Sequence, residues 1–446
     1  MTPAGFWRFA ALVVTALSLL AVALLTVGGT RDLVPSSTSP ADGAGDVSER
    51  PVVRVSYRHP VDAQSLRSAF RTEPPLDGTL ETDATGLRFV PARALAPGAL
   101  YSVVIAPGVR DLGGRTSRSP VRVAFRPREP RWLVLRQVGT VHALEVVSPA
   151  GGGARRITPP EDDVALAVIS PDGEEVAYAT RALPTGWTLW AVPAAGGAKR
   201  TIAADDQSAI GSLAWSPRGD LLVYESSQVL GSRIAAPRLW VVRGDGGQPA
   251  LLYGRADESG SAPSWAPDGR GLAFFENRLG AIALFDFTGR VRTIRTEIPA
   301  PASWAPDGGA IAFADRSGET GAQSVVKVAD VHAARVGPGP GAVSSTSDGA
   351  PAWSPTGEWI AFTRLSGTTG GIWISRPDGS DARPLHRDER WLYGPPFWDP
   401  AGGAVAFSRR PMRVDATDDQ AEIVLAPLDG PARSVPVGGS LVGWLP

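Results

Sequence analysis

The sequence predicts an all-β protein, because a turn motif recurs along it and its apolar segments are short. The motif is an aromatic or apolar residue, then Ser, Ala or Asp, then Pro, any residue and Gly, followed by an apolar run that ends in Tyr or Phe. Successive copies lie 39 to 50 residues apart. A period near 45 residues with Pro/Gly turns is typical of a β-propeller, one blade per repeat. The six copies contain Pro171, Pro217, Pro267, Pro306, Pro355 and Pro400.

Each repeat is interpreted as four strands, a to d, with strand a ending before the Pro-x-Gly turn and strand b ending at the aromatic residue. Residues 132–137, 141–147 and 155–158 supply three strands without a strand a, and residues 440–444 supply a strand a without followers. Together they form one mixed blade, which predicts a seven-bladed ring with no open edge. The alternative is a six-bladed ring with a decorating strand.

Residues ahead of the repeats show a different β pattern. Val53, Val55 and Tyr57 alternate with polar residues, which is the period of a half-buried strand. Further strands are expected at residues 78–82, 87–90, 100–106 and 121–126. About 90 residues of this kind predict an Ig-like β-sandwich.

Both regions resemble known families. Residues 36–127 resemble the bacterial Ig-like domain of surface-layer and other envelope proteins, through Pro40-Ala-Asp-Gly-Ala, Phe89-Val-Pro91, Leu95-Ala-Pro-Gly98 and Gly108-Val-Arg-Asp-Leu-Gly113. This resemblance implies a spacer or adhesion module without catalytic residues, and Asp62 and Asp111 are interpreted as turn-capping residues. Residues 131–446 resemble the TolB-type propeller repeat, whose members are often six-bladed. Ser354-Pro-Thr-Gly357 and Asp399-Pro-Ala-Gly402 depart from its turn motif, and we expect them to keep the turn but lose one side-chain hydrogen bond.

The N-terminus suggests a membrane anchor. The 22 residues between Arg8 and Arg31 carry no charge and are rich in Leu, Val and Ala, and about 20 apolar residues cross a bilayer as a helix. We expect an uncleaved transmembrane helix, a single-pass protein of the cell membrane, and C-terminal domains outside the cytoplasm. The alternative is secretion after signal cleavage near Ala21-Val-Ala23. The expected organisation is residues 1–35 as anchor and tether (with the polar stretch 30–39 as the tether), 36–128 as the Ig-like sandwich and 129–446 as the propeller.

Composition excludes several function classes. The chain has no cysteine, which excludes disulfides, thiol catalysis and Cys-ligated zinc. Residues 1–128 carry a net charge of +5 and the remainder −6, without the basic stripe of a nucleic-acid-binding protein. We therefore expect no nucleic-acid partner.

The long connections indicate a candidate binding face. Connections b–c and d–a share one face of a propeller blade, and the long segments all fall there. The segment from His386 to Gly394 mixes His386, Arg387, Arg390, Trp391 and Tyr393. Aromatic residues and Arg are enriched at binding hot spots, so these five residues are the candidate binding site. The Trp of each repeat is interpreted as packing between blades, and the Asp of Pro-Asp-Gly as turn chemistry.

Catalytic signals are weak. The four histidines lie in separate segments, and no nucleophile motif or metal-ligand spacing is present. We assign no catalytic residue, no metal site and no cofactor. The predicted function is a non-enzymatic, membrane-anchored envelope protein whose propeller binds a protein or glycan. The alternative is an envelope hydrolase or lyase with an active site in the propeller funnel.

Overall fold

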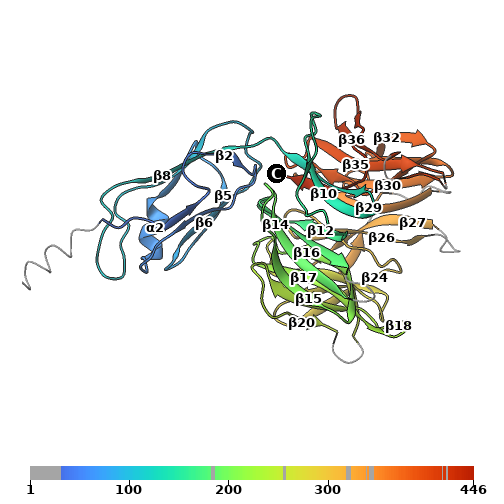
Figure 1. The fold of residues 1–446 in the computed structure, drawn as a ribbon, viewed down its shortest axis with the longest axis horizontal. Coiled ribbons are helices and arrows are strands. Elements are labelled where there is room, and N and C mark those ends of the chain that lie inside the picture. The colour runs from blue at the N-terminus through green and yellow to red at the C-terminus, as the bar shows by residue number, and fades with distance from the viewer. Residues whose placement is uncertain are drawn as a thin grey trace, which may run out of the picture. The chain divides into compact units, whose positions relative to one another are not determined.

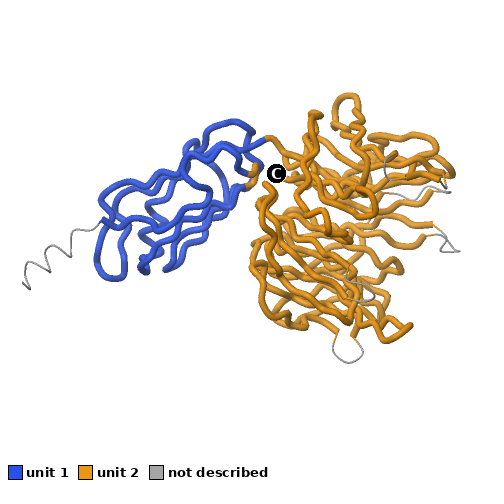
Figure 2. Tube along the Cα trace, viewed as in Figure 1, with its two compact units in different colours: residues 1–47, 51–128 blue, residues 48–50, 129–446 orange. Residues whose placement is uncertain are grey.

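A computed structural model describes residues 32–181, 186–254, 258–317, 323–337, 339–340, 346–413, 415–417 and 420–446. The chain divides into two compact units, one of residues 1–47 and 51–128 and one of residues 48–50 and 129–446 (Figure 2). The expected membrane anchor at residues 9–27 lies outside the described residues. Within the described ones, no helix is long and apolar enough to span a bilayer.

The first unit is a sandwich of two four-stranded sheets, as predicted. One sheet has the order β1 (Ser37–Ser39), β3 (Val53–Ser56), β6 (Gly86–Pro91) and β5 (Gly78–Thr82), and the other has β2 (Ala44–Val47), β8 (Val121–Pro127), β7 (Tyr101–Ile105) and β4 (Phe70–Glu73). Alternation places Val53 and Val55 in the core with full burial, while Arg54 between them is exposed.

Two features of this unit differ from expectation. The stretch at residues 30–39 is not a free tether in its described part, because Leu33 is buried and β1 pairs with β3. A short helix, α2 (Ala63–Ala69), was not expected; the Asp62 side chain caps it by accepting hydrogen bonds from the backbone N–H groups of Gln64 and Ser65. Asp111 accepts a hydrogen bond from the backbone N–H of Arg115 at 2.7 Å. Both carboxylates therefore serve local structure, as interpreted from the sequence.

The second unit consists of antiparallel sheets that follow one another along the chain (Figure 1). We name each sheet by its first strand, and call the sheet made from both ends of the unit the mixed sheet. The β12 sheet contains β12 (Val164–Ile169), β13 (Glu175–Arg181), β14 (Trp187–Pro193) and β15 (Arg200–Asp205). The β16 sheet contains β16 (Ser208–Trp215), β17 (Leu221–Leu230), β19 (Arg238–Arg243) and β20 (Ala250–Tyr253), with β18 (Arg233–Ile234) pairing with the end of β17.

The remaining sheets repeat this plan. The β21 sheet contains β21 (Gly260–Trp265), β22 (Gly271–Glu276), β23 (Ala281–Asp286) and β24 (Val291–Arg295). The β25 sheet contains β25 (Ser303–Trp304), β26 (Ala310–Ser317), β27 (Gln323–Asp330) and β28 (Arg335–Gly337). The β29 sheet contains β29 (Thr346–Trp353), β30 (Ile360–Ser366), β31 (Thr369–Ser375) and β32 (Arg383–Glu389). The β33 sheet contains β33 (Trp391–Tyr393), β34 (Phe397–Trp398), β35 (Ala404–Pro411), β36 (Glu422–Pro427) and β37 (Arg433–Val435).

The mixed sheet joins the two ends of this unit. It has the order β11 (Arg155–Arg156), β10 (Val141–Val147), β9 (Arg131–Val138) and β38 (Ser440–Leu445). Trp444 pairs with Trp132, and their rings lie 5.7 Å apart. The first strands of successive sheets contact one another in turn, and β34 contacts β38.

The repeated turn motif has a common structure. The glycine of every copy lies at φ between +68° and +80°, a conformation that glycine adopts without steric cost. Asp268 and Asp307 each accept a hydrogen bond from the backbone N–H two residues on. These carboxylates therefore stabilise turns, as interpreted. In the copy at residues 354–357, the Thr356 hydroxyl accepts from the backbone N–H of Glu358 at 3.5 Å in place of the Asp. In the copy at residues 399–402, the side chain of Asp399 accepts from the backbone N–H of Ala404, as Ser170 does from Glu175 in a copy that keeps the Asp.

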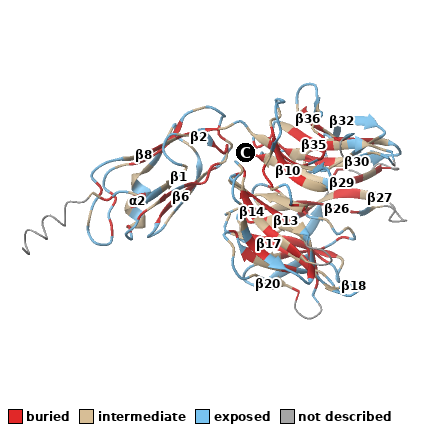
Figure 3. Cartoon of the chain, viewed as in Figure 1, coloured by how far each residue is buried: buried red, intermediate tan, exposed pale blue. Residues whose placement is uncertain are grey.

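The tryptophans at the ends of the first strands connect neighbouring sheets. The indole N–H donates to a backbone carbonyl of the preceding sheet in four cases: Trp265 to Ala214, Trp304 to Ser264, Trp398 to Ala352 and Trp444 to Phe397. The accepting residue each time directly precedes the preceding sheet's own aromatic residue. Burial runs along the middle strands of the sheets (red in Figure 3). The interpretation of these tryptophans as packing residues therefore agrees with the structure.

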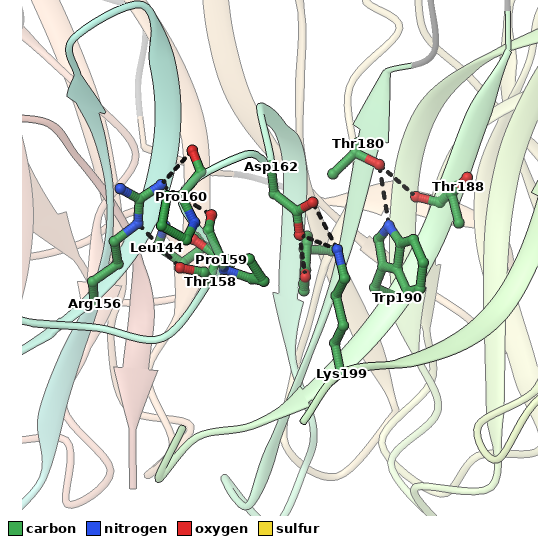
Figure 4. A network of polar contacts seen from close by, with 11 residues as sticks. Leu144, Arg156, Thr158, Pro159, Pro160, Asp162, Thr180, Thr188, Trp190 and Lys199 are labelled. Carbon is green, nitrogen blue, oxygen red and sulfur yellow. Dashed lines mark hydrogen bonds and ion pairs between the residues drawn. The ribbon is translucent and has the colours of Figure 1, made fainter. Parts of the chain in front are cut away.

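A polar network fixes the segment between β11 and β12, which leads from the mixed sheet to the β12 sheet (Figure 4). The carboxylate of Asp162 accepts hydrogen bonds from the Tyr178 hydroxyl at 2.6 Å and from Lys199 at 2.7 Å. Burial raises the pKa of Tyr178, and the bond to Asp162 raises it further, so the hydroxyl stays a donor. Arg156 donates to the carbonyls of Thr158 and Pro159. The segment is thus held by side chains of both the mixed sheet and the β12 sheet.

Candidate binding face

The predicted site segment is not a loop, which corrects the sequence interpretation. His386 and Arg387 lie in β32, Trp391 and Tyr393 lie in β33, and Arg390 alone makes the turn between these strands. Arg390 adopts φ +63°, and its N–H donates to the Thr368 carbonyl at 2.8 Å. A compact turn therefore holds the five residues on two consecutive strands.

A glycine pair allows these strands to approach β31 closely. A Cβ on Gly370 would lie 2.6 Å from the carbonyl oxygen of Trp391, and one on Gly371 would lie 2.7 Å from that of His386. Both distances are shorter than real Cβ contacts, so larger residues would push β32 and β33 away. The pair Gly370-Gly371 is a sequence signal for this close packing that the sequence analysis did not use.

The structure brings together three of the five predicted residues. His386, Trp391 and Tyr393 are partly buried, and His386 Nδ1 lies 3.0 Å from the Tyr393 hydroxyl. Both rings also lie 5.4 Å from Phe407. Burial lowers the pKa of His386, and the charge of Arg409 lowers it further; burial raises the pKa of Tyr393. Arg387 and Arg390 do not take part in this cluster. Both are exposed and make no side-chain hydrogen bond or ion pair with the described residues.

Arg409 organises the cluster, and the sequence analysis missed it. Its guanidinium donates to the carboxylates of Asp388 and Glu422, the latter at 2.9 Å, and lies 4.3 Å from the Trp391 ring centre. Burial alone would lower the pKa of Arg409, but the hydrogen bonds to Glu422 and Asp388 raise it above its ordinary value. The side chain is only 11% exposed. Arg409 therefore connects the β29 and β33 sheets and packs against the Trp391 ring.

A periodic signal identifies this position. In each sheet, the terminal aromatic or apolar residue of the first strand pairs with a residue of the next strand. The residue four positions after this partner is polar. Strand alternation directs it to the same side as the buried residue two positions earlier, which is Val134 in the mixed sheet and aromatic in the other six. These residues are Arg136, Thr180, Ser226, Glu276, Asp315, Arg364 and Arg409.

The charged members of this series have partners inside the protein. Arg364 and Asp348 form a fully buried ion pair at 2.6 Å, with side chains 5% and 0% exposed. Asp315 pairs with Lys327 at 2.6 Å, and Glu276 accepts from the backbone N–H of Ser259. Buried charges need such partners because removal from water is costly. These groups hold neighbouring strands and sheets together.

Two cavities flank β33. One, of about 340 Å³, is lined by Tyr393, Arg409, Arg410 and Ser440 among others. The other, of about 260 Å³, is lined by Trp391, Tyr393, Asp348, Arg364 and Thr363 among others. Small-molecule sites usually measure about 300–1,000 Å³, so the first cavity lies at the lower end of this range and the second lies below it; either is large enough for one side chain or one sugar ring of a larger partner.

Other candidate chemistry is sparse. In the described ranges, no group of three or more His, Cys, Asp or Glu residues is arranged to hold a metal ion. A third cavity, of about 440 Å³, lies among the ends of the first strands and is lined by Trp353, Trp398 and Trp444. The repeated tryptophans therefore both pack between sheets and line this cavity.

Comparison with known proteins identifies the first unit. Residues 30–126 match the family described as the bacterial Ig-like domain. No curated protein sequence matches the chain.

Solved structures resemble this chain at low sequence identity. They include TolB from Acinetobacter baumannii (16% identity over 71% of this chain and 80% of that one, TM-score 0.41). Oligogalacturonate lyase from Vibrio parahaemolyticus is 14% identical over 67% of this chain and 86% of that one, with TM-score 0.52. Prolyl oligopeptidase B from Galerina marginata is 10% identical over 75% of this chain and 50% of that one, with TM-score 0.50. At these identities the likenesses with TM-scores of 0.52 and 0.50 show the fold alone. The chain thus combines a bacterial Ig-like domain with a β-propeller that has TolB among its structural neighbours.

Proposed function

We propose that this chain is a non-enzymatic binding protein, and that the propeller face around β33 binds an acidic protein or glycan. The observation that carries this proposal is a set of three exposed arginines, Arg387, Arg390 and Arg410, around the half-buried Trp391. None of the three makes a side-chain hydrogen bond or ion pair with the described residues. Arginine guanidinium groups recognise carboxylates and other planar anions through paired hydrogen bonds.

The buried part of the cluster supports this role by making the face rigid. Trp391 rests on Arg409, and Tyr393 is held by His386. A partner would therefore meet aromatic rings that are already fixed in place, and binding would cost little side-chain entropy. Leu392, 36% exposed between the two cavities, adds an apolar contact.

We also propose that the propeller is a closed ring of seven blades. Its described strands form seven sheets, of which the mixed sheet contains both ends of the unit. The cyclic order of contacts among the first strands supports closure. For location, we propose a single-pass anchor in the cell membrane with the C-terminal domains outside the cytoplasm; the uncharged N-terminal run supports this, and secretion after cleavage is the alternative.

A second candidate is an envelope hydrolase or lyase, favoured by the grouping of His386, Asp388 and Tyr393. His386 Nε2 lies 3.9 Å from Asp388, and burial lowers the pKa of His386, which keeps the imidazole in the neutral form that can accept a proton. The binding role is preferred because the hydrogen bonds of Arg409 and Tyr393 are directed to other residues of the cluster. If the cluster is catalytic, His386→Gln will abolish turnover of a glycan or peptide substrate; in the binding role it removes no activity.

The binding role is tested by comparing the partners captured by the wild type with those captured by a variant whose charges on this face are reversed. The full-length chain and the variant R387E/R390E are incubated with soluble envelope extract, to detect protein partners, and with purified cell walls, to detect glycan binding. The expected result is a partner retained by the wild type at low salt and lost by the variant. The control R218E/R335E reverses two exposed arginines at a–b and c–d turns of other sheets and is expected to bind as the wild type does. Equal binding by R387E/R390E would refute the proposal.

A further inference from the structure

A separate cavity lies between the β21 and β25 sheets, at the end of the propeller opposite to β33. Its volume is about 320 Å³. Its apolar floor includes Leu272, Leu284, Phe285 and Trp304. This volume falls within the range of small-molecule sites, and no residue of the face around β33 contributes to it.

Strand register explains why this cavity exists. Trp265 pairs with Leu272. Gly271, directly before Leu272, pairs with Asp286, and Phe287 follows Asp286 in the chain. Phe287 lies against the Trp265 ring, with ring centres 5.6 Å apart. In the next sheet Trp304 pairs with Ile311, and the residue in the position of Phe287 is Val331. The smaller valine leaves Trp304 partly uncovered.

The β16 sheet confirms that this position lies over the tryptophan. Register places Gly244 there, and a Cβ on Gly244 would lie 3.4 Å from the Trp215 ring. A side chain at this position therefore reaches the tryptophan of its own sheet.

Two guanidinium groups at the cavity have no hydrogen-bond or ion-pair partner among the described residues. Arg270, before β22, and Arg290, before β24, line the cavity, and neither side chain makes a hydrogen bond or ion pair in the described part of the chain. Arg292, by contrast, donates to the carbonyls of Val331 and His332. Arg270 is therefore available to an anionic ligand, and Arg290, whose charge also acts on Asp286, has no side-chain hydrogen bond or ion pair among the described residues that such a ligand would have to replace.

The acidic residues of the cavity limit the charge of that ligand. Asp268, Asp286 and Asp307 also line it. The hydroxyl of Thr288 and the N–H groups of Thr288 and Arg290 hydrogen-bond to Asp286 and lower its pKa, so it stays ionised. Three carboxylates would repel a dianion such as phosphate, whereas one carboxylate can reach the two arginines.

We propose that this cavity binds a single carboxylate attached to an apolar, preferably aromatic, body. The carboxylate pairs with Arg270 and Arg290, and the apolar body rests on Trp304 and Phe285. Such a group can come from a free organic acid or from the C-terminus of a peptide with a large apolar last residue. The two sources share this chemistry and are separated by the test.

The test titrates the full-length chain with 3-phenylpropionate and with acetyl-Gly-Gly-Phe, each compared with its carboxamide, by isothermal titration calorimetry and saturation-transfer NMR. Both acids are expected to bind and both amides to bind at least about tenfold more weakly, because an amide cannot form the charge-assisted hydrogen bonds that a carboxylate forms with the two arginines. Tighter binding of the peptide assigns the site to peptide C-termini, and equal or tighter binding of 3-phenylpropionate assigns it to free acids. Failure of both acids to bind, equal binding of the amides, or equal competition by inorganic phosphate would overturn the proposal.

Two variants locate the binding. Val331→Phe restores the cover that Phe287 gives Trp265, and it is expected to abolish binding while the melting temperature is kept. R270Q/R290Q is expected to lower affinity at least about tenfold, whereas Arg218→Gln, an exposed arginine outside the cavity, is expected to leave affinity unchanged. If a well-folded Val331→Phe protein or R270Q/R290Q still binds the acids as the wild type does, the cavity is not the site.

Discussion

Arginines occur in two different settings around β33. Arg364 and Arg409 are buried between strands and sheets, and each is matched by carboxylates. Arg387 lies in β32, Arg410 follows Arg409 in β35, and Arg390 forms the turn between β32 and β33; all three are exposed and make no side-chain hydrogen bond or ion pair with the described residues. Strand alternation separates Arg410 from Arg409, because successive side chains point to opposite sides. The difference teaches that the buried set maintains the fold, whereas the exposed set is free to bind.

The largest effect is expected from opening a whole interface between sheets. Deleting Ser440–Pro446 removes β38, leaves an edge on β9 and an edge facing the β33 sheet, and removes Trp444. Loss of one core aromatic costs about 3–5 kcal/mol of the roughly 5–15 kcal/mol that stabilise a domain, so the deletion should cost more and promote association through the free edges. Thermal unfolding and light scattering measure both effects.

The matched control deletes Val229–Ala235, an equally long segment at the tip of the β17–β18 hairpin. The Ala235 N–H already donates to the Gln228 carbonyl at 2.8 Å, so the ends can be rejoined with little change. This deletion should melt near the wild type. If the two deletions have the same melting temperature, β38 does not close the ring and the six-bladed alternative gains support.

The next effect concerns the buried set of arginines directly. Arg364→Ala leaves Asp348 buried without its partner, which costs about 3–5 kcal/mol in other proteins. The double variant Asp348→Leu/Arg364→Met should recover most of that loss because no charge remains buried. Arg387→Ala should change the free energy of unfolding by less than about 0.5 kcal/mol. Urea unfolding of the three variants tests the comparison, and similar losses for Arg364→Ala and Arg387→Ala would contradict it.

A smaller effect is expected from His386. Burial holds its pKa below 6.5 in the folded state, so the unfolded chain binds a proton that the folded chain does not. Its contribution to the free energy of unfolding is therefore fully present above pH 6.5 and decreases as the pH falls through 6.5 towards the lowered folded-state pKa. His386→Gln should make stability fall less steeply between pH 7 and pH 5, as urea unfolding at a series of pH values measures. A wild-type slope in His386→Gln would show that this histidine does not titrate differently on folding.

Part of this arrangement could be predicted from the sequence. The turn motif located the first two strands of six sheets, because Pro and Gly fix backbone angles locally. The pairing of residues 440–444 with the start of the propeller also followed, because two incomplete blades remained at the ends of the repeats. Helix α2 was missed because Asp62 caps only seven residues, too few for a clear helical period.

The site was predicted less completely, for a physical reason. His386, Trp391 and Tyr393 were identified by residue type, but their segment was expected to be a loop; the glycine pair in β31 that draws the two strands in is distant in sequence from Trp391. Arg409 was missed because its partners lie in β32 and β36, and such pairing depends on tertiary contact. The periodic polar position was visible in the repeats and would have identified Arg364 and Arg409.

The most direct test of the two sets of arginines measures capture and melting on one preparation of R387E/R390E. The exposed arginines have no partners within the described protein, so their reversal should leave the melting temperature within about 1–2 °C of the wild type, the shift expected for surface changes. The same preparation should lose the partner that the wild type and R218E/R335E retain. A protein that melts normally and still captures the partner would contradict the proposed binding face, and one that loses stability as Arg364→Ala does would contradict the distinction between the two sets.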